Sequence, residues 1–177
     1  MSNETEMKDN VREDVYDKEL FDRLLDQNDI DEFRKEFLEL HNYEQSEYFE
    51  DTDDGNRQKI FEFLSPKEVA NFFDQLDFDD DDYESLFDNM DATYASHVLE
   101  EMSYDNAVDI LNELSKPKVA SLLTLMNKDN ANEIKALLHY EEDTAGGIMT
   151  TEFISLKSTT PVKEALIHVK EQAPDRK

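Results

Sequence analysis

The 177 residues of the chain include 45 Asp and Glu against 18 Lys and Arg, and the resulting formal net charge of −27 argues against nucleic acid or anionic lipid as a partner. The absence of cysteine excludes disulfides and thiolate metal sites, and no apolar run of about 18 residues is present that would cross a membrane. We therefore expect a soluble cytosolic protein. With 11 Phe and 7 Tyr residues, the chain is too apolar to be a disordered acidic tail.

The first part of the chain, residues 1–39, predicts a helical extension. Its apolar residues lie at helical spacing, first at Leu20, Phe21, Leu24 and Leu25. A second helix is expected to begin at Asp29, where Glu32 completes a pattern typical of a capping box. Asn42 opens a further short helix, and residues 51–56, Asp-Thr-Asp-Asp-Gly-Asn, then break the pattern as a turn.

From residue 64 onward the sequence repeats a unit in which a large apolar residue is followed by a capping residue. Five units are visible, and the last four are 12 residues apart: they begin at Leu64, Met90, Met102, Leu114 and Met126. Ser65, with Pro66 after it and Glu68 at the third helical position, is the clearest helix start, and Ser103 and Ser115 repeat the cap. Each unit therefore predicts one short helix.

Helices this short are not stable alone in water, so they must bury their apolar faces against one another. We therefore predict a mainly α fold, a superhelical stack of short helices. The residues expected in its core are Ala70, Phe72, Phe73, Ala95, Val98, Leu99, Ala107, Ile110, Leu111, Val119, Leu122, Leu123, Ala131 and Ile134.

The period changes near the C-terminal end. Residues 153–156 predict a short strand, and Pro161 opens a helix whose buried side is expected to carry Val162, Ala165, Leu166 and Val169. These elements read as an incomplete α/β start, because the chain ends before the strands and second helix that would cover them. The chain therefore looks like a fragment of a longer protein.

Asp105 and Asp109 are the strongest candidates for a ligand site. They lie four residues apart in the helix expected to begin at Ser103, so both carboxylates leave the same face of that helix. Like charges at this spacing are mildly destabilising unless a cation neutralises them. The residues alone leave two interpretations open, a solvated helix face and a cation site.

No catalytic constellation is visible in the sequence, and we do not expect an enzyme. The four histidines are scattered and accompany no nucleophile pattern: they are His41, His97, His139 and His168. The acidic run at residues 77–82 lacks the glycine at position six of an EF-hand loop. We interpret that run as a solvated loop between helices.

Residues 140–153 read Tyr-Glu-Glu-Asp-Thr-Ala-Gly-Gly-Ile-Met-Thr-Thr-Glu-Phe and join the helical region to the module that follows. Gly146 and Gly147 suit a helix C-cap and a domain boundary, and their backbone carbonyls alternatively suit ligation of a hard cation. In this context the segment closely resembles the junction of the MgtE family of magnesium channels, where a helical cytosolic N-domain passes into a CBS (cystathionine-β-synthase-type) domain. The resemblance extends over residues 40–177.

After the N-terminal helical extension at residues 1–39, this resemblance implies two parts: an MgtE-type N-domain at residues 40–144 and the truncated start of a CBS domain at residues 145–177. It also implies that Mg²⁺ is the bound ion and that its ligands are Asp105, Asp109 and the backbone carbonyl of Gly147. One position departs from the family pattern, because Asn71 stands where the family can place a glutamate ligand.

By the same resemblance, the chain is the cytosolic magnesium-sensing regulatory region of an MgtE-type magnesium transporter, at the cytoplasmic side of the cell membrane. Magnesium ions between the acidic faces of the N-domain and the CBS domains would cancel their repulsion, favour a compact homodimer and hold the pore shut. The implied partners are magnesium ions, the CBS and transmembrane domains of the same full-length protein, and a second copy of the chain.

Two other interpretations remain. The helical superhelix is also similar to the middle region of flagellar motor switch proteins, which are interaction scaffolds, although that family has no CBS start. Alternatively, the chain is a free-standing acidic adaptor that presents residues 79–82 to a basic partner.

Overall fold

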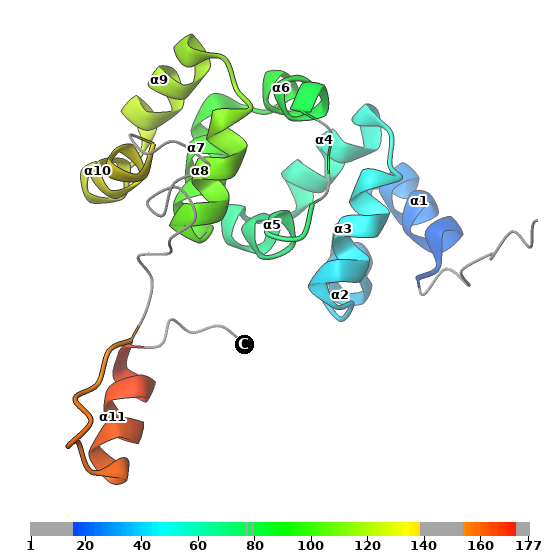
Figure 1. Ribbon diagram of the computed structural model, residues 1–177. Helices are drawn as coiled ribbons and strands as arrows, with labels where there is room; N and C mark the ends of the chain where they lie inside the picture. Colours follow the sequence, from blue (N-terminus) through cyan, green and yellow to red (C-terminus); the bar gives the residue numbers. More distant parts are fainter. Residues whose placement is uncertain (1–15, 77, 79, 139–153, 173–177) are drawn as a thin grey trace, which may run out of the picture.

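The computed structural model describes residues 16–76, 78, 80–138 and 154–172 (Figure 1). The described residues form eleven α-helices and no strand, and within them no helix is both long enough and apolar enough to span a bilayer. The helices are α1 Lys18–Gln27, α2 Ile30–Phe37, α3 Asn42–Glu50, α4 Asp54–Phe63, α5 Pro66–Phe73, α6 Asp80–Asn89, α7 Ala92–Glu101, α8 Tyr104–Asn112, α9 Lys116–Leu125, α10 Lys128–Leu137 and α11 Val162–Gln172.

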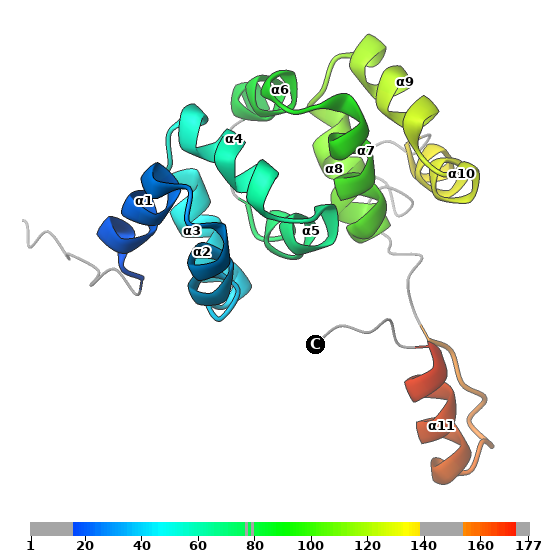
Figure 2. The ribbon, with the colours of Figure 1, turned by 180° about the vertical axis from the view of Figure 1, so that it is seen from behind.

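Helices α1 to α10 follow one another along a curved array, seen from its two sides in Figures 1 and 2. Much of the packing joins helices that are two apart in the chain: α3 contacts α5, α5 contacts α7, α7 contacts α9 and α8 contacts α10. The mainly α, superhelical fold predicted from the sequence is confirmed. The short helices are stabilised by packing on their neighbours, as in other stacked arrays.

The five helices predicted from the repeating units begin where the sequence places them. Ser65 caps α5 in a capping box, because its hydroxyl accepts from the backbone N–H of Glu68 while its own N–H donates to the Glu68 carboxylate at 2.8 Å. Ser103 and Ser115 occupy N-cap positions but make no side-chain hydrogen bond to their helices. The N–H of Ser115 donates instead to Glu84 on α6, at 2.9 Å.

Two helices of the structure were not predicted. The expected turn at residues 51–56 is wrong at its end, because Asp53 caps α4 by accepting from the N–H groups of Gly55 and Asn56. The expected loop at residues 77–82 is wrong in the same way, since α6 begins at Asp80. Acidic residues are favoured at the start of a helix by the macrodipole, so an acidic run is a start signal as well as a turn signal.

The predicted core is confirmed almost completely. Of the fourteen residues expected inside, only Val119 is half-buried, and the others have at most 8% of their surface exposed. The N-terminal half of the core is aromatic, with ring centroids 5.0 to 5.9 Å apart in a cluster made by Phe21, Phe33, Phe37, Tyr48 and Phe72. This cluster joins α1 and α2 to α3 and α5 through edge-to-face and stacked contacts.

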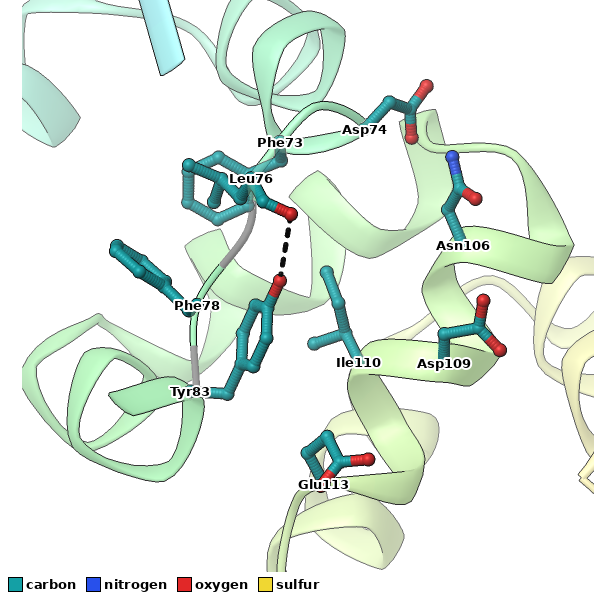
Figure 3. A pocket seen from close by; sticks show the side chains of 9 residues that line it. All are labelled: Phe73, Asp74, Leu76, Phe78, Tyr83, Asn106, Asp109, Ile110 and Glu113. Atoms are coloured by element: carbon teal, nitrogen blue, oxygen red, sulfur yellow. Dashed lines mark hydrogen bonds between the residues drawn. The ribbon is translucent and has the colours of Figure 1, made fainter. Parts of the chain in front are cut away.

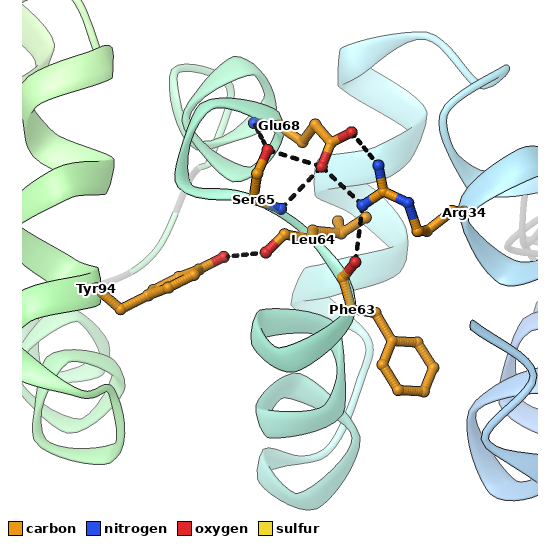
Figure 4. A network of polar contacts seen from close by, with 6 residues as sticks. All are labelled: Arg34, Phe63, Leu64, Ser65, Glu68 and Tyr94. Carbon is orange, nitrogen blue, oxygen red and sulfur yellow. Dashed lines mark hydrogen bonds and ion pairs between the residues drawn. The ribbon is translucent and has the colours of Figure 1, made fainter. Parts of the chain in front are cut away.

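Arg34 connects α2 to the junction of α4 and α5 (Figure 4). Its guanidinium donates to both carboxylate oxygens of Glu68, at 2.9 and 2.6 Å, and to the carbonyl of Phe63 at 2.8 Å. Burial raises the pKa of Glu68, but hydrogen bonds from Arg34 and Ser65 outweigh burial and hold it below its ordinary value. Helix α2 is therefore held to the stack by charge as well as by apolar packing.

The expected α/β start is only partly present in the described residues. The helix is found as α11, but residues 154–157 form no strand, and a single strand has no ladder in which to pair its backbone. The predicted buried face of α11 is wrong as well, since Val162 is 77% and Leu166 57% exposed. An amphipathic face is buried only where another element packs on it.

Candidate functional site

Asp105 and Asp109 lie on α8, one turn apart, as the sequence predicts. The opposite face of the helix is inserted in the core, where Ala107, Ile110 and Leu111 have at most 5% of their surface exposed. Asp105 in the first turn is half-buried, and Asp109 is exposed. The two carboxylates therefore lie at different depths of one surface, Asp105 partly sheltered from solvent and Asp109 accessible to it.

One oxygen atom of the Asp105 carboxylate, Oδ1, is buried and accepts no hydrogen bond from any residue that the structure describes. Buried polar atoms are nearly always paired, and leaving a charged one unpaired is costly. A cation that prefers oxygen ligands would satisfy this atom, so the carboxylate oxygens of Asp105 and Asp109 fit a hard divalent ion such as Mg²⁺.

Asp109 borders a hollow of about 240 Å³ between the end of α5 and α8 (Figure 3). Polar groups line one side: Asp74, which follows α5, together with Asn106, Asp109 and Glu113. Apolar side chains line the other side, and among them the rings of Phe78 and Tyr83 meet edge to face at 5.6 Å. Tyr83 is held in place because its hydroxyl donates to the carbonyl of Leu76 at 3.3 Å.

Sequence reasoning missed Asp74 and Glu113 as members of this surface. Each occupies the C-cap position of its helix, α5 for Asp74 and α8 for Glu113. They lie 39 positions apart in the chain numbering, and no local pattern links them. The only available signal was the acidic character of residues that directly follow an apolar helical run.

The described residues do not complete a metal centre by themselves. Nowhere in the described ranges do three His, Cys, Asp or Glu side chains come together closely enough to hold an ion. The third predicted ligand, Gly147, lies outside the described residues. A magnesium ion commonly keeps several water ligands and takes only one or two carboxylates. The arrangement on α8 therefore fits part of the shell of a hydrated ion.

The remaining candidates do not converge on a second site. Asn71, at the position where the MgtE family can place a glutamate, is exposed on α5. His41, His97 and His168 are exposed on three different helices or their caps, and His139 lies outside the described residues.

Comparison with known proteins identifies the family. A family model described as "MgtE intracellular N domain" matches residues 40–143, which is more than half of the chain. The chain belongs to this family. A curated relative of the N domain, the magnesium transporter MgtE of Enterococcus faecalis (strain ATCC 700802 / V583), is 44% identical over 144 residues, or 81% of this chain and 32% of the relative. The chain thus spans less than half of that relative's length.

Two solved structures share the fold. The crystal structure of the soluble part of a magnesium transporter superposes with a TM-score of 0.83 at 42% identity, covering 88% of this chain and 61% of that one. The cytosolic domain of the Mg²⁺ channel MgtE, solved in complex with ATP, gives a TM-score of 0.76 at 23% identity, covering 89% and 64%. These matches give no support to the interpretation as a flagellar motor switch scaffold.

Proposed function

We propose that the chain is the cytosolic magnesium-sensing regulatory region of an MgtE-type magnesium transporter, at the cytoplasmic side of the membrane, and that it is not an enzyme. The observation that carries the proposal is the carboxylate pair on α8, where Asp105 Oδ1 is buried without a hydrogen-bond donor in the described part of the chain. Membership of the N domain family supports it, because the relatives are magnesium transporters.

The proposed mechanism is electrostatic. Asp105 and Asp109 would hold a hydrated magnesium ion, with the backbone carbonyl of Gly147 as a third protein ligand. The formal net charge of −27 makes this surface repel other acidic domains, and ions placed between the N-domain and the CBS domains would cancel that repulsion. Closure would then follow from the higher affinity of the compact homodimer for the ion, and the transmembrane domain of the same protein would be held shut.

The test replaces both carboxylates with amides of nearly the same shape. In Asp105→Asn with Asp109→Asn, we expect the magnesium concentration that protects the full cytosolic region from protease to rise at least about tenfold, equivalent to about 1.4 kcal/mol of lost ion binding. The measurement is a magnesium titration of protease protection, with the wild type and the variant side by side.

A matched control is available on α10. Asp129 and Glu133 are also four residues apart on one helix and are exposed, so Asp129→Asn with Glu133→Gln removes the same charge at the same spacing. This control should leave the midpoint unchanged. An equal shift in both double variants would mean that total charge, and no particular site, controls the response, and the assignment of Asp105 and Asp109 would fall.

A further inference from the structure

A second hollow, of about 380 Å³, lies between α4 and the start of α7 and is separate from the surface of α8. Its apolar wall is made by Phe61, Met90 and Tyr94, and its rim carries the carboxylates of Glu62 and Asp91. The volume falls within the range of ligand sites, and the lining combines aromatic rings with a few polar groups.

The aromatic wall is fixed from behind. The Tyr94 hydroxyl donates to the carbonyl of Leu64 at 2.8 Å, as Figure 4 shows, and its ring centroid is 5.8 Å from that of Phe61. Phe61 packs in turn on two further rings of the core, with centroid distances of 5.6 Å to Phe49 and 6.3 Å to Phe73. The rings therefore offer a preformed surface, which lowers the entropic cost of binding.

The carboxylates of the rim lie on two different elements. Asp91 is held in place because its Oδ1 accepts from the N–H groups of Thr93 and Tyr94, both at 3.0 Å. Glu62 is exposed on α4. Within the described residues, no lysine or arginine pairs with either carboxylate. The hollow therefore presents negative charge and ring faces together.

Elsewhere in this fold, an aromatic ring and a nearby carboxylate together bind a lysine or arginine side chain of the chain itself, and two such cases are seen in the described residues. The Arg57 guanidinium lies over the rings of Phe49 and Phe78, at 5.3 and 5.1 Å, and is 3.4 Å from the carboxylate of Asp54. The Lys18 ammonium lies 5.4 Å from the centre of the Tyr48 ring and 3.6 Å from the carboxylate of Asp22. A ring beside a carboxylate attracts a cation through both its quadrupole and its charge.

We infer that the hollow of Phe61, Tyr94, Glu62 and Asp91 receives an arginine side chain from a basic segment of the membrane part of the same full-length protein. Arginine suits it better than lysine, because a planar guanidinium stacks on rings and forks toward carboxylates at the same time. Cytoplasmic loops of membrane proteins are enriched in Lys and Arg, and a domain with a net charge of −27 attracts them. The choice of occupant rests on the proposed function.

The binding step can be tested on this chain alone by NMR titration with a blocked Gly-Gly-Arg-Gly-Gly peptide. We expect amide shifts confined to residues 58–62 and 90–94 and none with the uncharged citrulline peptide. Glu62→Gln should weaken binding about three- to fivefold, as for one exposed charge beside a ring, and Glu133→Gln on α10 should not. Equal binding of the citrulline peptide, or equal loss in both variants, would overturn the site.

The occupant is tested in the full-length protein in its membrane. A photo-crosslinking amino acid at Gln58, which lines the hollow, should cross-link to a basic segment of the membrane part. Cross-links to other proteins alone would refute that occupant. The magnesium midpoint of protease protection should not move in Glu62→Gln, so failure of this site and failure of the site on α8 are distinguishable.

Discussion

The bridge between Arg34 and Glu68 is expected to fasten α2 to the rest of the stack, and a double-mutant cycle measures its strength. Arg34→Met keeps an apolar stem of similar length and removes the guanidinium. Glu68→Gln removes the negative charge but keeps an oxygen and an amide for the capping box. The cycle therefore isolates the bridge from the cap of α5.

The expected size follows from geometry and exposure. The pair makes two parallel charge-assisted hydrogen bonds, but its side chains are still 35% and 22% exposed, so solvent screens part of the interaction. Hydrogen bonds to charged groups contribute about 1.5 to 3 kcal/mol and exposed ion pairs about 0.2 to 1 kcal/mol. We expect a coupling free energy that falls between these ranges, about 1 to 1.5 kcal/mol. Arg34→Met should cost about 1 kcal/mol more than Glu68→Gln, because it also leaves the carbonyl of Phe63 without its donor.

The assay is urea unfolding at neutral pH followed by far-ultraviolet circular dichroism, with four variants at equal salt. Lys59 and Asp26 form a pair that also joins distant parts of the chain, but its carboxylate is 73% exposed, so the same cycle on Lys59→Met and Asp26→Asn should give little coupling. A coupling for Arg34 and Glu68 no larger than for this control pair would refute the reasoning.

The same pair predicts a dependence on pH. The pKa of Glu68 is lower in the folded state than its ordinary value of about 4.3, so the bridge contributes its full stability above that value. The contribution is lost as the pH falls through the folded pKa. The difference in stability between the wild type and Glu68→Gln should therefore shrink below about pH 4.

Two further predictions concern the missed helix and the ion. Asp53→Ala should lower stability by about 0.5 to 2 kcal/mol by removing the cap of α4, whereas Asp53→Asn should cost little, and thermal melts of both variants test this. Millimolar MgCl₂ should raise the melting temperature more than NaCl of equal ionic strength, because a site present only in the compact state adds stability by mass action. The additional rise should disappear in the double variant at Asp105 and Asp109. Equal shifts from the two salts would mean that charge screening alone explains the effect.

The helices that the sequence predicts best are those with several agreeing local signals. In α5, Ser65, Pro66 and Glu68 mark the start, and the apolar residues that follow lie on one face. In α4, only Ile60 and Phe63 are buried, and its cap Asp53 stands in an acidic run that also suits a turn. One signal with two meanings is not enough to predict an element.

The candidate site, like the helices, was predictable only where local sequence signals determine it. The common face of Asp105 and Asp109 follows from helical geometry alone, so their spacing was sufficient to predict it. Asp74 and Glu113 line the hollow beside Asp109 because of how α5 and α8 pack, and this packing is tertiary information that no local pattern contains. The buried Oδ1 of Asp105 could not be predicted either, because its burial depends on residues from other elements.

The distribution of positive charge explains how so acidic a chain stays compact while most of its surface carboxylates remain without a lysine or arginine partner in the described residues. Two little-exposed cations of the described residues join separate elements: Lys118 binds Glu84 and Asp88 of α6, and Arg57 donates to the carbonyls of Phe49 and Glu50. Their side chains are only 17% and 18% exposed, so they stabilise the stack from within and neutralise little of the outer surface. The excess of carboxylates on that surface is then left to mobile ions. A uniform surface would respond to ionic strength alone, so a specific magnesium response requires a place like Asp105, where one carboxylate oxygen is already removed from water.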